Sequence, residues 1–195
     1  MDTKESGPEF VPTKRVIILI DLAGSSKAFQ SHGDIKMASL FQQYYTDCET
    51  VLTGKGGTVI KFMGDACLAT FPPDQAGSAV EAVLELQSKI AVLARHHEVA
   101  IELGANVHMA SAIEAEFGAG TRRTRDILGR GVNQTFLLGR GAGIRISEPV
   151  YRTLPSGRRS PWQKHKPPAV YHLGQRAAGI YEGTGKDPAA NTERW

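Results

Sequence analysis

The chain has 195 residues, enough for one domain with a buried core. Its 41% hydrophobic and 22% charged residues are ordinary for a globular protein, and a formal net charge of +3 is too small to indicate a nucleic-acid partner. No apolar run approaches the ~20 residues of a membrane span, and residues 1–13 lack the apolar core of a signal peptide. We therefore expect a cytoplasmic protein without membrane or nucleic-acid partners, with a disordered N-terminus (1–13), one domain (14–174) and a disordered tail (175–195).

The first half of the chain predicts strands and helices in the order of a ferredoxin-like core. Arg15–Ile20 is rich in β-branched residues, which indicates a buried strand that ends at Asp21. Small and capping residues at 22–26 open a helix, and apolar residues recur at helical spacing between Asp34 and Thr53. The later elements are strands at 58–63 and 66–71 joined by Gly64 and Asp65, a helix at 75–96 and a strand at 100–112. This βαββαβ order predicts an α+β fold of the ferredoxin-like class.

The second half predicts a C-terminal extension of that core. A basic turn begins near Thr121, and a short helix covers 132–138. A strand is expected at 144–147, a helix begins at Glu148, and a last strand covers 169–173. The extension therefore adds two strands and two helices to the core.

The predicted topology brings two aspartates together. The third strand of a βαββαβ core lies between the first two, so the end of the first strand adjoins the hairpin between the second and third. Asp21 ends that strand and Asp65 lies in that hairpin. Each aspartate alone is ordinary turn chemistry, but together their oxygens suit two Mg²⁺ or Mn²⁺ ions. The backbone carbonyl of Leu22 is a further candidate ligand, and the turn formed by Gly24, Ser25 and Ser26 can cradle phosphates.

Three segments together resemble the catalytic domain of class III nucleotide cyclases, over roughly residues 14–174. Val16–Ser26 is similar to the first metal-binding segment of that family, and Gly56–Phe71 is similar to the second. Asp126–Asn133 is similar to the segment with a base-selecting acid and, seven residues later, a catalytic asparagine. The resemblance implies a phosphorus–oxygen lyase that converts a nucleoside triphosphate into a 3′,5′-cyclic monophosphate and pyrophosphate with two metal ions.

The resemblance also implies a head-to-tail homodimer with sites shared between subunits. One subunit supplies Asp21, Asp65 and the phosphate turn, and the other supplies Lys61, Asp126 and Asn133. Lys61 and Asp126 would contact the base, and Asn133 would orient the ribose. The structural alternatives are a solvated strand lysine, a surface acid paired with arginine and a helix-capping amide.

The chain departs from the family pattern where an arginine usually follows the asparagine by four residues. This chain has Leu137 there, and loss of such an arginine can cost several orders of magnitude in rate. Arg140 is our candidate for the missing catalytic charge, and Arg130 is the alternative. Lys164 and Lys166 resemble the triphosphate-binding lysine of the family only loosely.

The base is the least determined part of the prediction. The Lys61 and Asp126 pair resembles the pair that reads adenine, yet cytosine presents a similar acceptor and amino group. A smaller base needs bulky side chains around it. The nearby candidates are Phe62, Met63, Tyr44 and Tyr45.

The missing arginine and the unusual segment 160–173 give the chain a resemblance to the stand-alone pyrimidine cyclases of bacterial anti-phage signalling, and we expect no regulatory domain beside the cyclase domain. We therefore expect cyclic UMP or cyclic CMP, made as a messenger for a separate effector protein. An adenylate cyclase is the first alternative. A catalytically weak, nucleotide-binding dimer is the second.

Overall fold

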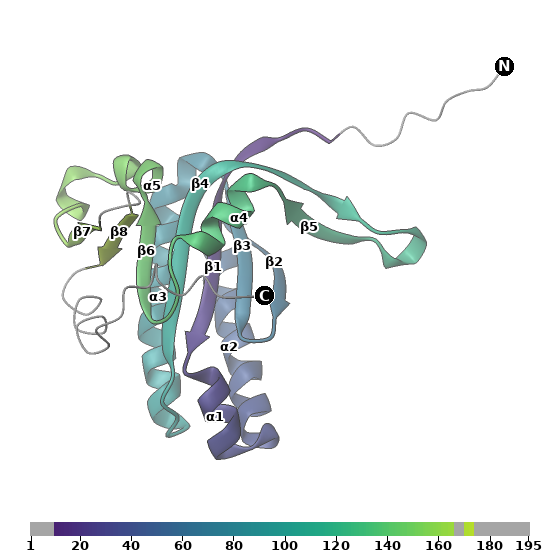
Figure 1. The fold of residues 1–195 in the computed structure, drawn as a ribbon, viewed down its shortest axis with the longest axis vertical. Coiled ribbons are helices and arrows are strands. Elements are labelled where there is room, and N and C mark those ends of the chain that lie inside the picture. The colour runs from purple at the N-terminus through teal and green to yellow at the C-terminus, as the bar shows by residue number, and fades with distance from the viewer. Residues whose placement is uncertain (1–9, 166–169, 174–195) are drawn as a thin grey trace.

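One eight-stranded sheet organises the chain in a computed structural model that describes residues 10–165 and 170–173 (Figure 1). Its core strands are β1 (Thr13–Ala23), β2 (Thr58–Met63), β3 (Ala66–Phe71) and β4 (Glu102–Phe117). β3 lies between β1 and β2 and is antiparallel to both, and β4 is antiparallel to β1. The predicted ferredoxin-like α+β core is therefore confirmed.

Two long helices cover one face of this sheet. α2 (Asp34–Gly54) and α3 (Ala76–His96) lie behind the strands in Figure 1, and the short α1 (Ser25–His32) leads into α2. Both long helices carry apolar residues at helical spacing, so each presents one apolar side to the sheet. The even-numbered residues of β1, from Val16 to Leu22, pack with these helices in the main core. Full burial of each such aliphatic side chain contributes about 1.5–3 kcal/mol.

The opposite face of the sheet carries a smaller apolar cluster beneath α4 (Arg130–Leu137). Ile17, from the odd-numbered side of β1, packs there with Leu68, Ala112, Ile127 and Val132. Because side chains alternate along a strand, Arg15 and Asp21 project from this same face. The charged side chains of Arg15 and Asp21 and the smaller apolar cluster therefore lie on the same face of the sheet.

The C-terminal extension contains the predicted helices α4 and α5 (Glu148–Thr153) and the predicted strands β6 (Gly143–Ser147) and β8 (Val170–Leu173). β6 pairs in parallel with β4, and β8 is antiparallel to β6. The structure adds β5 (Thr124–Leu128) and β7 (Trp162–His165), where no strand was predicted. β5 pairs with the end of β4, which runs to Phe117, and the two form an arm that projects from the sheet in Figure 1.

Both ends of β1 extend beyond the predicted strand. β1 begins at Thr13 and continues to Ala23, so Asp21 lies within the strand and pairs with Gly104. Phe10 stacks on Phe117 of the arm, with ring centroids 5.5 Å apart. The predicted tail, 175–195, lies outside the described residues. Within the part of the chain that is described, no helix is both long and apolar enough to cross a bilayer.

Candidate functional site

Asp21 and Asp65 lie at the same end of the core strands. Asp21 follows Ile20, the last β1 residue paired with β3, and Asp65 lies in the turn between β2 and β3. Both side chains are half-buried. Burial raises the pKa of Asp21, the guanidinium of Arg145 opposes this rise, and the carboxylate of Asp65 adds to it. The structure therefore brings together two carboxylates that repel each other.

This donor set fits a hard divalent cation. Carboxylate oxygens are the protein ligands that Mg²⁺ and Mn²⁺ prefer, and a bound cation would relieve the repulsion between Asp21 and Asp65. In residues 10–165 and 170–173, no group of three or more His, Cys, Asp or Glu side chains is placed so that it could hold a metal ion. Water, substrate phosphates or a backbone carbonyl such as that of Leu22 would have to complete the coordination. Leu22 lies beyond the β1 residues that pair with β3.

Three hydroxyl groups hold the turn that carries Asp65. Ser25 Oγ donates a hydrogen bond to Asp65 Oδ2 at 2.5 Å. The hydroxyl of Tyr44 donates to the backbone carbonyl of Asp65 at 3.1 Å, and that of Tyr45 donates to the carbonyl of Gly64 at 2.6 Å. The side chains of α1 and α2 thus fix both the turn and its carboxylate.

The predicted phosphate turn forms the start of α1, with Gly24 as the residue before the helix and Ser25 and Ser26 as its first two residues. Gly24 adopts a φ of 90°, and a side chain there would overlap the carbonyl oxygen of Ala100, so the position requires glycine. Ser25 is buried and its hydroxyl is bonded to Asp65, whereas Ser26 is exposed. The prediction assigned phosphate binding to the backbone N–H groups of this turn; of its two serine side chains, that of Ser26 faces solvent.

Gly104 makes room for the carboxylate of Asp21. It pairs with Asp21 on one side and with Gly143 on the other. A Cβ atom on Gly104 would overlap both Asp21 Oδ1 and the carbonyl oxygen of Gly141. The carboxylate of Asp21 therefore occupies the space that a side chain at position 104 would fill.

A buried arginine organises the loop that follows α4. Arg145 on β6 is 1% exposed, and its guanidinium donates to four carbonyls of one loop. The acceptors are the backbone oxygens of Arg140 at 2.5 Å, Gly141 at 3.1 Å, Ala142 at 3.0 Å and Gly143 at 3.3 Å. A side chain on Gly139 would overlap Arg145, so the loop can close around the guanidinium only with glycine there.

Lys61 and Asp126 form an ion pair within one chain. Lys61 Nζ donates to Asp126 Oδ2 at 2.7 Å, and the backbone N–H of Ile127 donates to Asp126 Oδ1 at 2.8 Å. Although burial raises the pKa of Asp126, these bonds lower it below its usual range. An ionised carboxylate accepts hydrogen bonds and donates none. Lys61, whose side chain is 38% exposed, is thus ion-paired, and the two predicted base-contacting residues lie together.

The other predicted site residues lie on the surface. Asn133 is exposed in α4, and Leu137, at the end of that helix, is 76% exposed. The side chains of Arg130, Arg140 and Lys164 are also exposed. Lys166 lies outside the described residues. Such exposure is compatible with the expectation that Asn133 acts on a site of another subunit.

Three of the four side chains predicted to fill space around a small base lie elsewhere. Tyr44 is fully buried, and Tyr45 stacks on Phe62 with ring centroids 4.1 Å apart, both against the core on the helix side. β2 is irregular between Val59 and Lys61, and Met63 packs against the cluster on the opposite face. Met63 therefore remains the one such candidate on the face of the sheet that carries Lys61.

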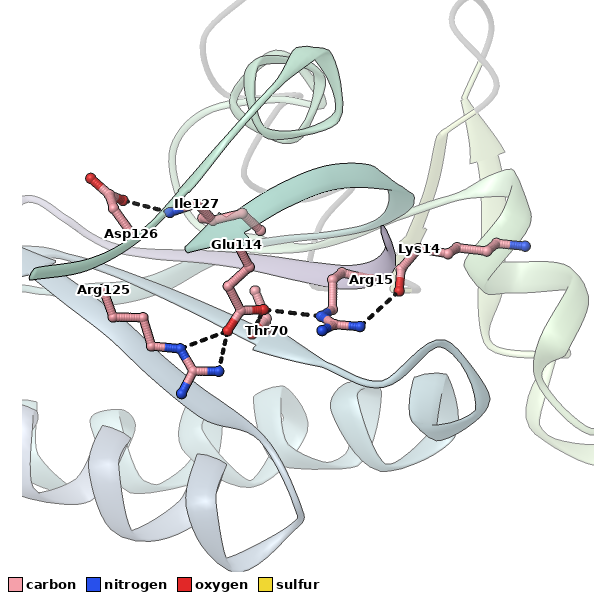
Figure 2. A network of polar contacts seen from close by, with 7 residues as sticks. All are labelled: Lys14, Arg15, Thr70, Glu114, Arg125, Asp126 and Ile127. Atoms are coloured by element: carbon pink, nitrogen blue, oxygen red, sulfur yellow. Dashed lines mark hydrogen bonds and ion pairs between the residues drawn. The ribbon is translucent and has the colours of Figure 1, made fainter. Parts of the chain in front are cut away.

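A polar network that was not predicted from the sequence joins the arm to the sheet (Figure 2). The carboxylate of Glu114 accepts hydrogen bonds from Arg15 Nε at 3.0 Å and from Arg125 Nε at 2.8 Å. Thr70 makes a longer contact of 3.5 Å with it. Acidic and basic residues that alternate along two strands are the signal of such cross-strand pairs. In this chain they are Glu114, Glu116, Arg123 and Arg125.

Solved structures of nucleotide cyclases share this architecture. The adenylyl cyclase CyaB from P. aeruginosa superposes with a TM-score of 0.74 at 18% identity, covering 86% of this chain and 97% of that chain. The guanylyl cyclase Cya2 gives a TM-score of 0.72 at 18% identity, covering 85% of this chain and 94% of that one. The chain has the fold of a nucleotide cyclase domain. At these identities the likeness establishes the cyclase fold and leaves the base undecided, because both adenylyl and guanylyl cyclases share it.

A bacterial light-regulated adenylyl cyclase also shares the cyclase fold, with a TM-score of 0.72 and 20% identity over 86% of this chain and 53% of that chain. In sequence, the chain is 26% identical over 115 residues to adenylate cyclase 2 of Rhizobium meliloti (strain 1021). That alignment covers 55% of this chain and 32% of the relative, so the chain matches about a third of that protein. No protein-family model matches the sequence.

Proposed function

We propose that this chain is a nucleotide cyclase, which converts a nucleoside triphosphate into a 3′,5′-cyclic monophosphate and pyrophosphate. The observation that carries the proposal is the pair of Asp21 and Asp65, with Ser25 bonded to Asp65, beside the phosphate turn of a cyclase fold. A fold alone hosts many functions, so the proposal rests on this site.

The proposed site assigns separate tasks to residues of two subunits. Asp21 and Asp65 hold two Mg²⁺ or Mn²⁺ ions, which supply charge neutralisation at the triphosphate and a lowered pKa for the ribose 3′-hydroxyl. The backbone N–H groups at the start of α1 bind phosphate oxygens. In a head-to-tail dimer, the other subunit contributes the Lys61 and Asp126 pair to the base and Asn133 to the ribose.

Arg140 is the residue that we propose for the catalytic charge missing at Leu137. The loop that carries it is fixed by four carbonyl contacts with Arg145, while its own side chain is exposed. A guanidinium presented by a rigid loop can bind phosphate oxygens at two points. Lys164 on β7 and Lys166 are proposed as weaker triphosphate contacts.

For the base, we propose ATP as the first substrate. Asp126 is ionised and accepts hydrogen bonds only, so it favours a base with an exocyclic amino group. Lys61 supplies a donor to a neighbouring ring acceptor. Adenine offers both partners side by side, as its 6-amino group and the ring acceptor N1. Guanine and uracil also present N–H donors, but their Watson–Crick edges have no ring-nitrogen acceptor for Lys61.

CTP is the second candidate because cytosine offers the same acceptor and amino group. Cyclic CMP made for a separate antiviral effector is the part of the pyrimidine prediction that remains compatible with an ionised Asp126. Met63, on the face that carries Lys61, is the remaining side chain to fill space beside a small ring. Uracil lacks both the exocyclic amino group and the ring-nitrogen acceptor, so cyclic UMP is the less favoured pyrimidine product.

The test of the proposed function offers ATP, CTP, GTP and UTP in parallel with Mn²⁺, and identifies the cyclic product by mass spectrometry. We expect cyclic AMP as the dominant product, with release of pyrophosphate. Asp21→Ala and Asp65→Ala should each lower turnover by about a thousandfold or more, because each removes a metal ligand. Asp34→Ala, at an exposed aspartate that begins α2, is the matched control and should keep wild-type turnover. Nucleotide binding without release of pyrophosphate by the wild-type protein would contradict the proposal.

A further inference from the structure

The arm strand β5 is attached to the sheet at two points that flank Asp126. On one side, Arg125 donates hydrogen bonds to Glu114. On the other side, Ile127 is 1% exposed and packs with Ile17 in the smaller apolar cluster. Asp126 thus lies between a polar anchor and an apolar anchor.

Glu114 connects this arm to the centre of the sheet. Its side chain is 5% exposed and binds Arg15 of β1 as well as Arg125 of β5, as Figure 2 shows. Burial raises the pKa of Glu114, but the hydrogen bonds from the two arginines outweigh this effect and lower the pKa below its usual range. A nearly buried, ionised carboxylate with partners on two strands is a fixed point, because removing its charge leaves two guanidinium groups without their counter-ion and weakens both contacts.

The position of Asp126 depends on these anchors. Its carboxylate points away from Glu114 in Figure 2, and Oδ2 accepts the 2.7 Å hydrogen bond from Lys61 of β2. Among the described strands, β5 pairs through its backbone with β4 alone, so contacts of its side chains with other strands decide how the arm lies over the sheet. A shift of β5 by about an ångström would break the bond between Lys61 and Asp126.

We propose that Glu114 is a positioning residue for base recognition, which sets Asp126 against Lys61 by holding Arg125. This inference rests on the proposed function, since Asp126 can select a base only where a nucleotide binds. Glu114 itself touches no substrate in this proposal. Its loss should therefore change which base is preferred more than it changes binding of the triphosphate.

The experiment measures dissociation constants of 3′-deoxy-ATP and 3′-deoxy-GTP by calorimetry with Mg²⁺. These analogues lack the 3′-hydroxyl, so they report base discrimination whether or not the protein turns over nucleotide. The wild-type protein should prefer 3′-deoxy-ATP, and Glu114→Gln should reduce that preference about tenfold. Glu116→Gln is the matched control: this side chain lies two residues further along β4, is 65% exposed and contacts Arg123 only at 4.0 Å. It should keep the wild-type preference.

A second pair of variants separates loss of position from loss of folding. Arg125→Gln removes the ion pair between Arg125 and Glu114 while Arg15 stays bound to Glu114, and the Arg125 side chain is 56% exposed. Arg123→Gln is the control, because the Arg123 side chain is 50% exposed. Arg125→Gln should reproduce the loss of discrimination with an unchanged melting temperature. Hydrogen exchange of the amides at 124–128 should accelerate in Glu114→Gln and in Arg125→Gln, but not in the controls.

The outcomes separate the two proposals. Absence of a cyclic product from wild-type protein with ordinary nucleotides overturns the proposed function, while the analogue measurements still test the arm. The inference about Glu114 is overturned by a wild-type preference in the folded Glu114→Gln and Arg125→Gln variants. It is also overturned by an equal loss in the controls, or by a wild-type protein that does not discriminate between the analogues.

Discussion

At the scale of single residues, the hydroxyl of Ser25 orients the carboxylate of Asp65. Asp21 and Asp65 could be predicted because strand order alone places them at one edge. The hydrogen-bond partner of Ser25 could not be predicted, because a hydroxyl in a turn can bind either a phosphate or another part of the protein. The packing of α1 determines which of the two it contacts. In the structure this hydroxyl donates to Asp65 Oδ2, which orients the carboxylate and leaves Oδ1 for a cation.

Ser25→Ala should weaken binding of Mn²⁺ about tenfold, because Asp65 loses the charge-assisted hydrogen bond that orients it. Titration of the nucleotide-free protein, followed by the electron paramagnetic resonance signal of free Mn²⁺, measures this directly. Ser31→Ala is the control, since Ser31 lies in the same helix, is exposed, and bonds only to the carbonyl of Lys27. Equal affinities in the three proteins would show that Ser25 does not support the metal site.

At the scale of elements, periodicity predicted the core strands and the long helices but not the strands β5 and β7. β2, β3, α2 and α3 repeat apolar residues over six or more positions, and their bounds agree with prediction to within a residue. β5 has five residues of which only Ile127 is buried, so its basic residues resemble a turn. β5 forms a strand because it pairs with β4 and because Arg125 binds Glu114 on that strand. The residues of β5 alone do not indicate these partners.

Gly104→Ala tests how closely β4 and the loop after α4 approach Asp21. The added methyl group would overlap Asp21 Oδ1 and the carbonyl oxygen of Gly141, so we expect a loss of about 1–3 kcal/mol in the free energy of unfolding. Chemical denaturation measures this loss, and Mn²⁺ binding should weaken with it.

Gly77→Ala is the matched control for that substitution. Gly77 lies in α3, and a methyl group there meets no atom within 4 Å. Because alanine has the higher helix propensity, this variant should be as stable as the wild type or gain about 0.5–1 kcal/mol. If Gly104→Ala were as stable as Gly77→Ala, the close approach at Asp21 would be wrong.

At the scale of the whole molecule, the ferredoxin-like core was predictable and the arm was not. The order of strands and helices fixes the core, whereas the arm depends on contacts between residues far apart in the chain, such as Arg15 with Glu114. The predicted division of the site between two subunits stays a prediction. It accounts for the exposure of Asn133 and Leu137, which one chain does not cover.

Complementation tests that division. Asp65→Ala and Asn133→Ala should each be inactive alone, since each breaks both sites of a homodimer. After equal mixing and subunit exchange, half of the dimers carry one intact site, so about a quarter of wild-type activity should return. Different affinity tags on the two variants establish that exchange has occurred. If tagged mixed dimers form and stay inactive, the site is not shared in this way.

The absence of a side chain at Gly104 has a consequence for how this chain tolerates mutation. Gly104 has no functional group, yet the carboxylate of Asp21 can lie where it does only because position 104 has no side chain. In a saturation library selected for nucleotide turnover, we expect its profile to match that of Asp21, with every substitution depleted. A neighbouring strand position such as Ala105 should instead accept some variation, so a map of tolerance would mark a backbone position as part of the active site.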